Sequence, residues 1–172
     1  MPEKIIGIGG VSRSGKSFLA KQLAARFEKT GRSVKTFDQD DFVFPERMIP
    51  TIRNHLDWER PESIDFQKLK LAISNARKDY DIVIAEGLMV FSYPDVFRMF
   101  NYTIFIKLDR EEFLARKRSD LRWGREPDWY IDHIWEGYLK YGQYPKGYNP
   151  NLILDGNDLF DIDGTYKNIT KG

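Results

Sequence analysis

Residues 10–17 read GVSRSGKS, and this stretch decides the fold of the chain. It matches GxxxxGK followed by Ser or Thr, a pattern in which every fixed position helps to hold a polyphosphate. The glycines let the backbone curl so that successive N–H groups point inward, and a following helix adds the positive end of its dipole. Lys16 would reach the phosphate oxygens, while the hydroxyl of Ser17 would bind Mg²⁺. The stretch therefore predicts a phosphate-binding loop.

The surroundings of the loop favour this interpretation over a glycine-rich turn with a surface lysine. Residues 4–8 are a short β-branched run, which predicts a buried strand. Residues 18–27 carry apolar side chains at helical spacing, and Gly31 marks the end of that helix. We expect ATP and Mg²⁺ as cofactors. The expected nucleotide-binding residues are those of the loop and the first helical turn: Gly10, Ser12, Arg13, Ser14, Gly15, Lys16, Ser17 and Phe18.

Strand and helix patterns alternate along the rest of the chain. Apolar runs predict further strands at 33–37, 81–86, 102–108 and 151–154. Apolar spacing predicts helices after Asp65, after Asp109 and over 128–141. Nearly continuous apolar strands that alternate with helices indicate a parallel sheet covered on both faces. The predicted fold class is therefore α/β, of the P-loop NTPase type, and the chain ends soon after its last predicted strand.

Composition narrows the classes of protein. The chain has 172 residues, which is the usual size of one domain, so we expect a single domain over residues 1–172. Its net charge of +1 argues against nucleic-acid binding, because polynucleotide binders carry a large basic excess. It has no cysteine, no signal-peptide pattern and no long apolar stretch. We therefore expect a cytoplasmic protein that binds a small molecule and neither nucleic acid nor membrane.

Acidic side chains follow two of the predicted strands. Asp40 and Asp41 come after the second strand, and Glu86 closes the third. In an α/β sheet the carboxyl ends of the strands meet at the ligand edge, beside the phosphate loop. An enzyme that phosphorylates a hydroxyl needs one carboxylate to orient or deprotonate that hydroxyl, and another to help hold the metal. Solvated turns or helix caps are the alternative use of such aspartates.

Several motifs together give the chain a family resemblance. It is similar to the uridine kinase-like P-loop kinases, and among them to the nicotinamide riboside kinases, through IIGIGGVSRSGKS, QDDF, AEGLMVFSY and HIWEGYLKY. The resemblance implies a nucleoside- or nucleotide-kinase-like fold with a small arginine-rich lid at about 116–130. It implies that Asp40 is the general base, that Glu86 assists Mg²⁺ beside Ser17, and that Asp57 binds ribose hydroxyls. Phe42 of QDDF joins the expected substrate-binding residues.

These motifs say less about the nucleobase of the substrate. Leu56 occupies the position of an aromatic residue that stacks on nicotinamide in human-type enzymes. Trp123 would then supply the stacking face, since an indole ring attracts a cationic ring.

The lid sequence is rich in arginine. We expect Arg118 and Arg122 to act on the phosphates, because guanidinium forks match phosphoryl oxygens. Arg116 and Arg125 fit that role and an exposed basic helix face equally well. The aromatic residues over 128–141 should pack the helix on the core, and His133 should be a hydrogen-bonded structural residue.

The function that follows is phosphorylation of the 5′-hydroxyl of a ribonucleoside-like molecule, with nicotinamide riboside ahead of uridine or cytidine. A nucleotide-binding regulatory module without catalysis is the alternative from another class. A nucleic-acid-processing ATPase is a third, and the near-neutral charge argues against it.

Overall fold

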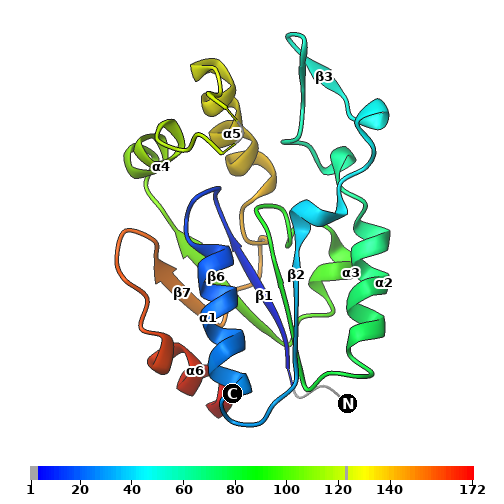
Figure 1. Ribbon diagram of the computed structural model, residues 1–172, viewed down its shortest axis with the longest axis vertical. Coiled ribbons are helices and arrows are strands. Elements are labelled where there is room, and N and C mark those ends of the chain that lie inside the picture. The colour runs from blue at the N-terminus through cyan, green and yellow to red at the C-terminus, as the bar shows by residue number, and fades with distance from the viewer. Residues whose placement is uncertain (1–3, 123) are drawn as a thin grey trace.

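The computed structural model describes residues 4–122 and 124–172. Its centre is a five-stranded sheet in the order β2-β5-β1-β6-β7, and every neighbouring pair is parallel (Figure 1). The strands are β1 (Lys4–Gly10), β2 (Val34–Asp38), β5 (Ile82–Glu86), β6 (Tyr102–Lys107) and β7 (Leu152–Asp155). The predicted α/β class, with a parallel sheet between helices, is confirmed.

Helices cover both faces of this sheet (Figure 1). Their bounds are α1 Lys16–Glu28, α2 Phe66–Ala76, α3 Pro94–Phe97, α4 Arg110–Arg118, α5 Asp128–Tyr141 and α6 Ile162–Lys171. Because side chains alternate along a strand, Ile6 and Ile8 pack with α1 and α6, whereas Ile5 packs with α2 and α5. Two hydrophobic cores result, one on each face. No helix in residues 4–122 and 124–172 is long and apolar enough to cross a membrane.

The turn from β1 into α1 depends on glycine. Gly15, which precedes α1, has φ +102°, and a Cβ there would lie 2.8 Å from the ring of Phe160. Gly10 has φ +154°, and a Cβ there would lie 2.8 Å from the carbonyl oxygen of Ile106. Other residues rarely adopt such backbone angles, so these two glycines let the loop curl at the carboxyl end of β1.

The segment between β2 and α2 has short elements of its own. It contains a hairpin of β3 (Thr51–Ile52) and β4 (His55–Leu56). Arg53 and Asn54, with φ of +47° and +60°, form the tight turn of that hairpin. Short 3₁₀ turns lie at Gln39–Phe42, Glu46–Met48 and Pro61–Ser63. These elements hold the segment against the carboxyl edge of the sheet.

A helix that the sequence patterns did not predict follows the last strand. Helix α6 follows β7 and packs on α1, with Ile169 fully buried between them and the sheet. Asp161 accepts a hydrogen bond from Gly164 N at 2.9 Å and so caps the helix. Arg26 of α1 pairs with Asp163 at 2.7 Å. The helix was missed because its apolar stripe is short and interrupted by glycine and threonine.

We predict that Ile169→Ala lowers the free energy of unfolding by about 2–5 kcal/mol, the usual cost of emptying a buried isoleucine site. Urea unfolding followed by circular dichroism measures the change. Lys167→Ala, an exposed substitution on the same helix, is the control and should stay within about 0.5 kcal/mol of the wild type. Equal stability of Ile169→Ala and wild type would show that α6 contributes nothing to the core.

Candidate active site

The phosphate loop holds its lysine inward. Lys16 begins α1, is only 9% exposed, and donates a hydrogen bond from Nζ to the carbonyl oxygen of Val11 at 2.8 Å. Burial lowers the pKa of this ammonium, while the carboxylates of Glu86 and Asp40 counteract the shift. The cation therefore lies within electrostatic reach of two acidic groups that come from other strands.

The loop fits a polyphosphate. Among the described residues, Ser14 Oγ is the buried side-chain oxygen or nitrogen that lacks a hydrogen-bond partner. The N–H groups in the first turn of α1 have no acceptor within their own helix. An anion at the start of α1 would supply acceptors for both. Phe18 is 58% exposed, so it would contribute its N–H group and not its ring.

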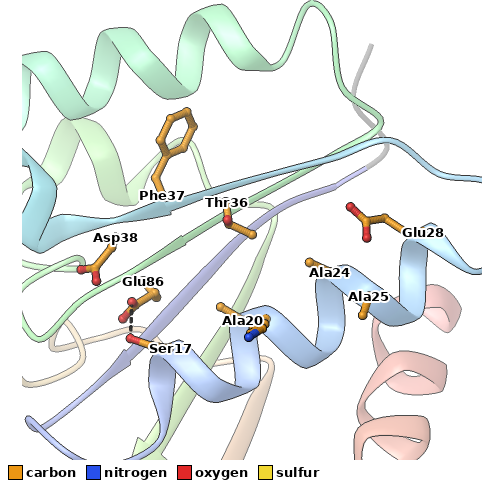
Figure 2. Close-up of a pocket in the computed structure, with 10 residues that line it drawn as sticks. Ser17, Ala20, Ala24, Ala25, Glu28, Thr36, Phe37, Asp38 and Glu86 are labelled. Carbon is orange, nitrogen blue, oxygen red and sulfur yellow. Dashed lines mark hydrogen bonds between the residues drawn. The ribbon is translucent and has the colours of Figure 1, made fainter.

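The residues predicted to hold metal lie together. Ser17 Oγ, on α1, donates to Glu86 Oε1, at the end of β5, at 2.7 Å. Figure 2 shows this pair and Asp38 at one end of the groove between α1 and β2. Mg²⁺ keeps most of its waters and takes few protein ligands, so one hydroxyl and one carboxylate fit it. No larger cluster of metal-binding side chains occurs within the part of the chain that the structure describes.

Burial raises the pKa of Glu86, the carboxylate of this candidate metal site. Glu86 is 4% exposed, and removal from water raises its pKa to about 7, although the Lys16 ammonium acts in the opposite direction. Without a cation, Glu86 therefore holds a proton more readily than a free glutamate does, and a divalent metal would favour the ionised carboxylate.

The predicted base lies beside the phosphate loop. Asp40 follows β2 in the 3₁₀ turn Gln39–Phe42, and its N–H donates to Asp38 at 2.8 Å. Removal from water and the neighbouring Asp38 carboxylate raise the pKa of Asp40, while Lys16 lowers it. The arrangement yields a carboxylate that binds a proton more readily than a free aspartate does.

Asp57 and His133 form a buried pair. Asp57 follows β4 and is 3% exposed, and its Oδ1 lies 2.8 Å from His133 Nε2 on α5. The same oxygen accepts a hydrogen bond from Glu59 N at 3.1 Å. His133 is thus a hydrogen-bonded residue, as predicted, and it fixes the orientation of a carboxylate that was expected to bind substrate.

Glu59 is an acidic residue of the site that the sequence patterns did not predict. Removal from water, followed by the charge of Asp40, raises the pKa of Glu59 to about 7, and Lys117 lowers it. Tyr130 OH lies 3.5 Å from Glu59 Oε1. The available signal was a second acidic residue two positions after Asp57, in the turn that follows β4. Glu59 stands between the predicted base and the predicted ribose carboxylate.

The lid arginines differ in their contacts. Arg116 braces the loop, because it donates to the carbonyl oxygens of Arg13 at 3.0 Å and of Gly156 at 2.8 Å. Arg122 forms two hydrogen bonds of 2.8 Å with the carboxylate of Asp120. Arg118 lies 3.7 Å from Asp128 and is 55% exposed. The two arginines expected to act on phosphate are thus both more than half exposed, and each lies beside an aspartate.

Some of the aromatic side chains lie where the sequence predicted them, and others do not. Tyr130 and Tyr138 are buried on α5, and Trp135 packs partly buried on the same core, as predicted. Phe42 is 9% exposed and lies edge-on to Phe37 in the core, so little of it remains to contact a substrate. Trp123 lies outside the described residues.

Comparison with known proteins assigns the chain to a family. Nicotinamide riboside kinase 1 from Homo sapiens is 32% identical to it, over 91% of this chain and 87% of the relative. This chain belongs to the nicotinamide riboside kinase family. Uridine kinase-like protein 3 from Arabidopsis thaliana is 23% identical over 92% of this chain and 38% of the relative. No protein-family model matches the sequence.

Solved structures agree on the fold of this kinase. A possible uridine kinase from Bacillus stearothermophilus superposes with a TM-score of 0.60 at 18% identity, over 90% of each chain. The likeness shows the P-loop kinase fold. With the family assignment, it makes the protein a phosphotransferase.

We predict that the metal-free kinase loses stability as the pH rises from about 4.5 to about 7. Glu86 has its pKa raised from 4.5 to about 7 by burial, so the folded protein keeps a proton that the unfolded chain releases. Glu86→Gln keeps an acceptor for Ser17 but cannot ionise. It should raise the melting temperature at pH 8 by roughly 2–4 °C for every 1 kcal/mol gained, and change it less at pH 4.5.

The measurement is thermal unfolding in EDTA across this pH range. The pKa of Glu59 is also raised to about 7, so Glu59 too lowers the stability of the protein as the pH rises. Glu86→Gln should therefore remove only part of the dependence of stability on pH. Glu46→Gln, at an exposed carboxylate, is the control. Parallel pH profiles for Glu86→Gln and wild type would contradict the assignment of the buried charge.

Proposed function

We propose that this kinase transfers the γ-phosphate of ATP, with Mg²⁺, to the 5′-hydroxyl of a ribonucleoside-like molecule, with nicotinamide riboside as the first candidate. One observation carries the proposal. The strand register aligns Ile8 of β1, Glu86 of β5 and Asp38 of β2, so the phosphate loop with Lys16 and the turn with Asp40 both begin at the same edge of the sheet. The cation proposed to bind phosphate and the carboxylate proposed to bind the acceptor therefore follow neighbouring strand ends.

The donor side is assigned to the loop and its neighbours. Lys16 and the loop N–H groups would bind the phosphates, and Ser17 with Glu86 would hold Mg²⁺, which neutralises charge on the phosphate oxygens. Lys16 must leave the Val11 carbonyl to reach a phosphate, and this exchanges a neutral acceptor for a charged one.

The acceptor side begins with Asp40. A general base works best when its pKa approaches the working pH, and the raised pKa of Asp40 moves it in that direction. Asp40 would hold the acceptor hydroxyl and accept its proton as the oxygen attacks phosphorus. Arg122, which is also in electrostatic range of Asp40, would stabilise charge on the transferred group.

Asp57 is proposed to bind the ribose. Its Oδ1 takes the hydrogen bonds from His133 and Glu59 N, which leaves Oδ2 for adjacent hydroxyls of the sugar. A buried carboxylate that loses its hydroxyl partners costs on the order of 1–3 kcal/mol, so such a site prefers ribose over deoxyribose.

The nucleobase of the substrate would pack against a group of aromatic side chains near Leu56. His55 stacks on Tyr130 with ring centroids 3.9 Å apart, and Trp129 lies edge-on to His55. Carboxylates and aromatic faces suit a cationic nicotinamide ring, and the human relative is named for nicotinamide riboside. The similarity to uridine kinase-like proteins supports uridine or cytidine as the alternative. A regulatory module without catalysis would need no acceptor carboxylates.

The test is a coupled ADP-release assay with ATP and Mg²⁺ against nicotinamide riboside, uridine and cytidine. We expect turnover with at least one ribonucleoside, highest kcat/KM for nicotinamide riboside, and loss of most turnover in Lys16→Ala, whose charge serves the phosphates. The 2′-deoxy form of the best substrate should be at least about tenfold poorer. Binding of ATP without turnover on any acceptor would favour the regulatory module.

We predict that Asp40→Asn lowers kcat by about 10²–10⁴-fold with ATP affinity unchanged, because the amide cannot accept the acceptor proton. Steady-state kinetics and ATP titration measure the two effects separately. Asp41→Asn is the matched control, since it removes the same charge from the neighbouring residue of the same turn. If ATP affinity collapses while turnover survives, Asp40 belongs to the metal site.

A further inference from the structure

The β3–β4 hairpin and the start of α5 both lie beyond the carboxyl ends of the strands (Figure 1) and contact one another. His55, on β4, stacks on Tyr130 of α5 with ring centroids 3.9 Å apart. Its Nε2 lies 3.4 Å from Oε2 of Glu126, which comes just before α5. At the turn of the hairpin, the guanidinium of Arg53 lies 5.1 Å from the centre of the Trp129 ring. Two segments that are distant in the sequence are therefore joined through their side chains.

The two histidines of the chain both lie in this contact. His55 of the hairpin faces Glu126. In the opposite sense, His133 of α5 faces Asp57, the residue that follows β4, at 2.8 Å. Each pair joins an imidazole of one segment to a carboxylate of the other, and a carboxylate attracts an imidazolium more strongly than a neutral imidazole. The contact between hairpin and helix therefore depends on protons.

Both ring nitrogens of His55 face an oxygen. Nδ1 lies 2.6 Å from the carbonyl oxygen of Leu56, and Nε2 faces the carboxylate of Glu126. A neutral imidazole has one N–H group and can donate to only one of these oxygens, whereas an imidazolium can donate to both. Loss of the second ring proton therefore removes a donor and also the charge that attracts Glu126.

Other charged or titratable groups lie at the same contact. They include Arg53, Asp57, Glu59, Tyr130 and His133. Removal from water raises the pKa of Tyr130, so its phenol stays neutral beside His55. Arg53 keeps its charge and lies over the ring of Trp129. Of the groups packed against His55, Glu126 is therefore the anionic partner from the α5 side.

The hairpin carries the acceptor side of the site. Asp57 follows β4 directly, and its N–H donates to the carbonyl oxygen of Pro50 at 2.8 Å. Two residues later, Glu59 packs on Gly137 of α5, where a Cβ would lie 3.1 Å from the Cβ of Glu59. Movement of the hairpin away from α5 would therefore displace the carboxylate proposed to bind ribose. The phosphate loop follows a different strand, so the same movement would not displace it.

We propose that His55 and Glu126 form a proton-dependent clasp, which holds the β3–β4 hairpin against α5 and thereby positions Asp57 for the acceptor. The clasp is tight when His55 carries both ring protons and loosens when the ring is neutral. Histidine is the side chain that ordinarily changes charge between about pH 5 and pH 8, so the clasp responds near neutral pH. The effect on the acceptor rests on the proposed function, whereas the clasp itself does not.

An ion pair of constant strength is the alternative. Such a pair would hold the hairpin equally at every pH, whereas the clasp loosens as His55 loses its proton. The pKa values of Glu59 and Glu86 are both raised to about 7, so these groups also change charge in the same range. Each variant is therefore compared with the wild type at one pH, which leaves the contribution of Glu59 and Glu86 the same on both sides.

The experiment uses Glu126→Gln and His55→Gln, which each remove one charge of the pair, and His55→Arg, which keeps a positive charge at every pH. Glu126→Gln is the decisive variant, because His55 also belongs to the aromatic group proposed to meet the nucleobase. Glu136→Gln, at an exposed carboxylate of α5, is the matched control. Hydrogen exchange of residues 51–58, corrected for the intrinsic effect of pH, measures opening of the hairpin without any substrate. The ADP-release assay gives KM for the acceptor and for ATP.

At pH 5.5, we expect the hairpin amides of Glu126→Gln and His55→Gln to exchange about two- to fivefold faster than those of the wild type, the effect of one partly exposed ion pair. KM for the acceptor should rise in proportion, with KM for ATP unchanged. At pH 8.5 both differences should disappear, because the wild type has then lost the charge on His55. His55→Arg should exchange slowly at both pH values, and Glu136→Gln should behave as the wild type does.

The clasp is overturned if Glu126→Gln exchanges within twofold of the wild type at pH 5.5, or if it exchanges faster by the same factor at both pH values. If exchange follows the expectation while no acceptor is phosphorylated, the proposed function fails and the clasp stands. If an acceptor is phosphorylated and exchange follows the expectation, but KM for the acceptor is the same in Glu126→Gln and wild type, the positioning of Asp57 by the clasp is overturned.

Discussion

The register of three parallel strands is the constraint on which the site depends. Ile8 of β1 pairs with Glu86 of β5, and Glu86 pairs with Asp38 of β2. This alignment ends the strands together, so the phosphate loop, the metal carboxylate and the turn that carries Asp40 start at one edge. A slip of one residue would turn Glu86 to the opposite face of the sheet, toward the core beneath α2, where its charge would have no partner.

Several charged side chains gather at the carboxyl edge of the sheet. Carboxyl groups from β5, from the turn after β2 and from the segment after β4 lie within range of one another and of Lys16. Removal from water is the main cause that raises the pKa of Glu86 and of Glu59 to about 7, and the charge of Asp40 adds to both shifts. Such clusters cost stability and are typical of functional sites. In this kinase, stability is lost because acidic and basic side chains lie close together at one edge of the sheet. A bound metal ion and a bound phosphate would neutralise their charges.

Helices α4 and α5 complete the site from outside the sheet. Helix α5 contributes His133, which orients Asp57, and Tyr130, which lies against His55 and Glu59. Helix α4 contributes Arg116, which braces the loop, and Lys117. The two helices join at the segment with Asp120 and Arg122, so any movement of that segment would be transmitted to both the donor and the acceptor sides.

The sequence alone determined the strand-loop-helix at residues 4–28 and the parallel α/β class. These features are local or follow from strand polarity, because hydrophobic periodicity and glycine placement act over a few residues. The helix caps at Asp65 and Asp109 were equally visible, and both side chains accept the expected backbone hydrogen bonds.

Only the tertiary structure decided the rest. The contact of His133 with Asp57 spans 76 residues, and that of Arg116 with Gly156 spans 40, so no local pattern could indicate either. The burial of Lys117 and Glu59 depends on how α4 and the β3–β4 segment pack over the sheet edge, and a charged residue in an ordinary polar stretch carries no sign of it. Helix α6 is stabilised by packing on α1 and not by its own propensity, so its short apolar stripe became significant only once the fold brought the two helices together.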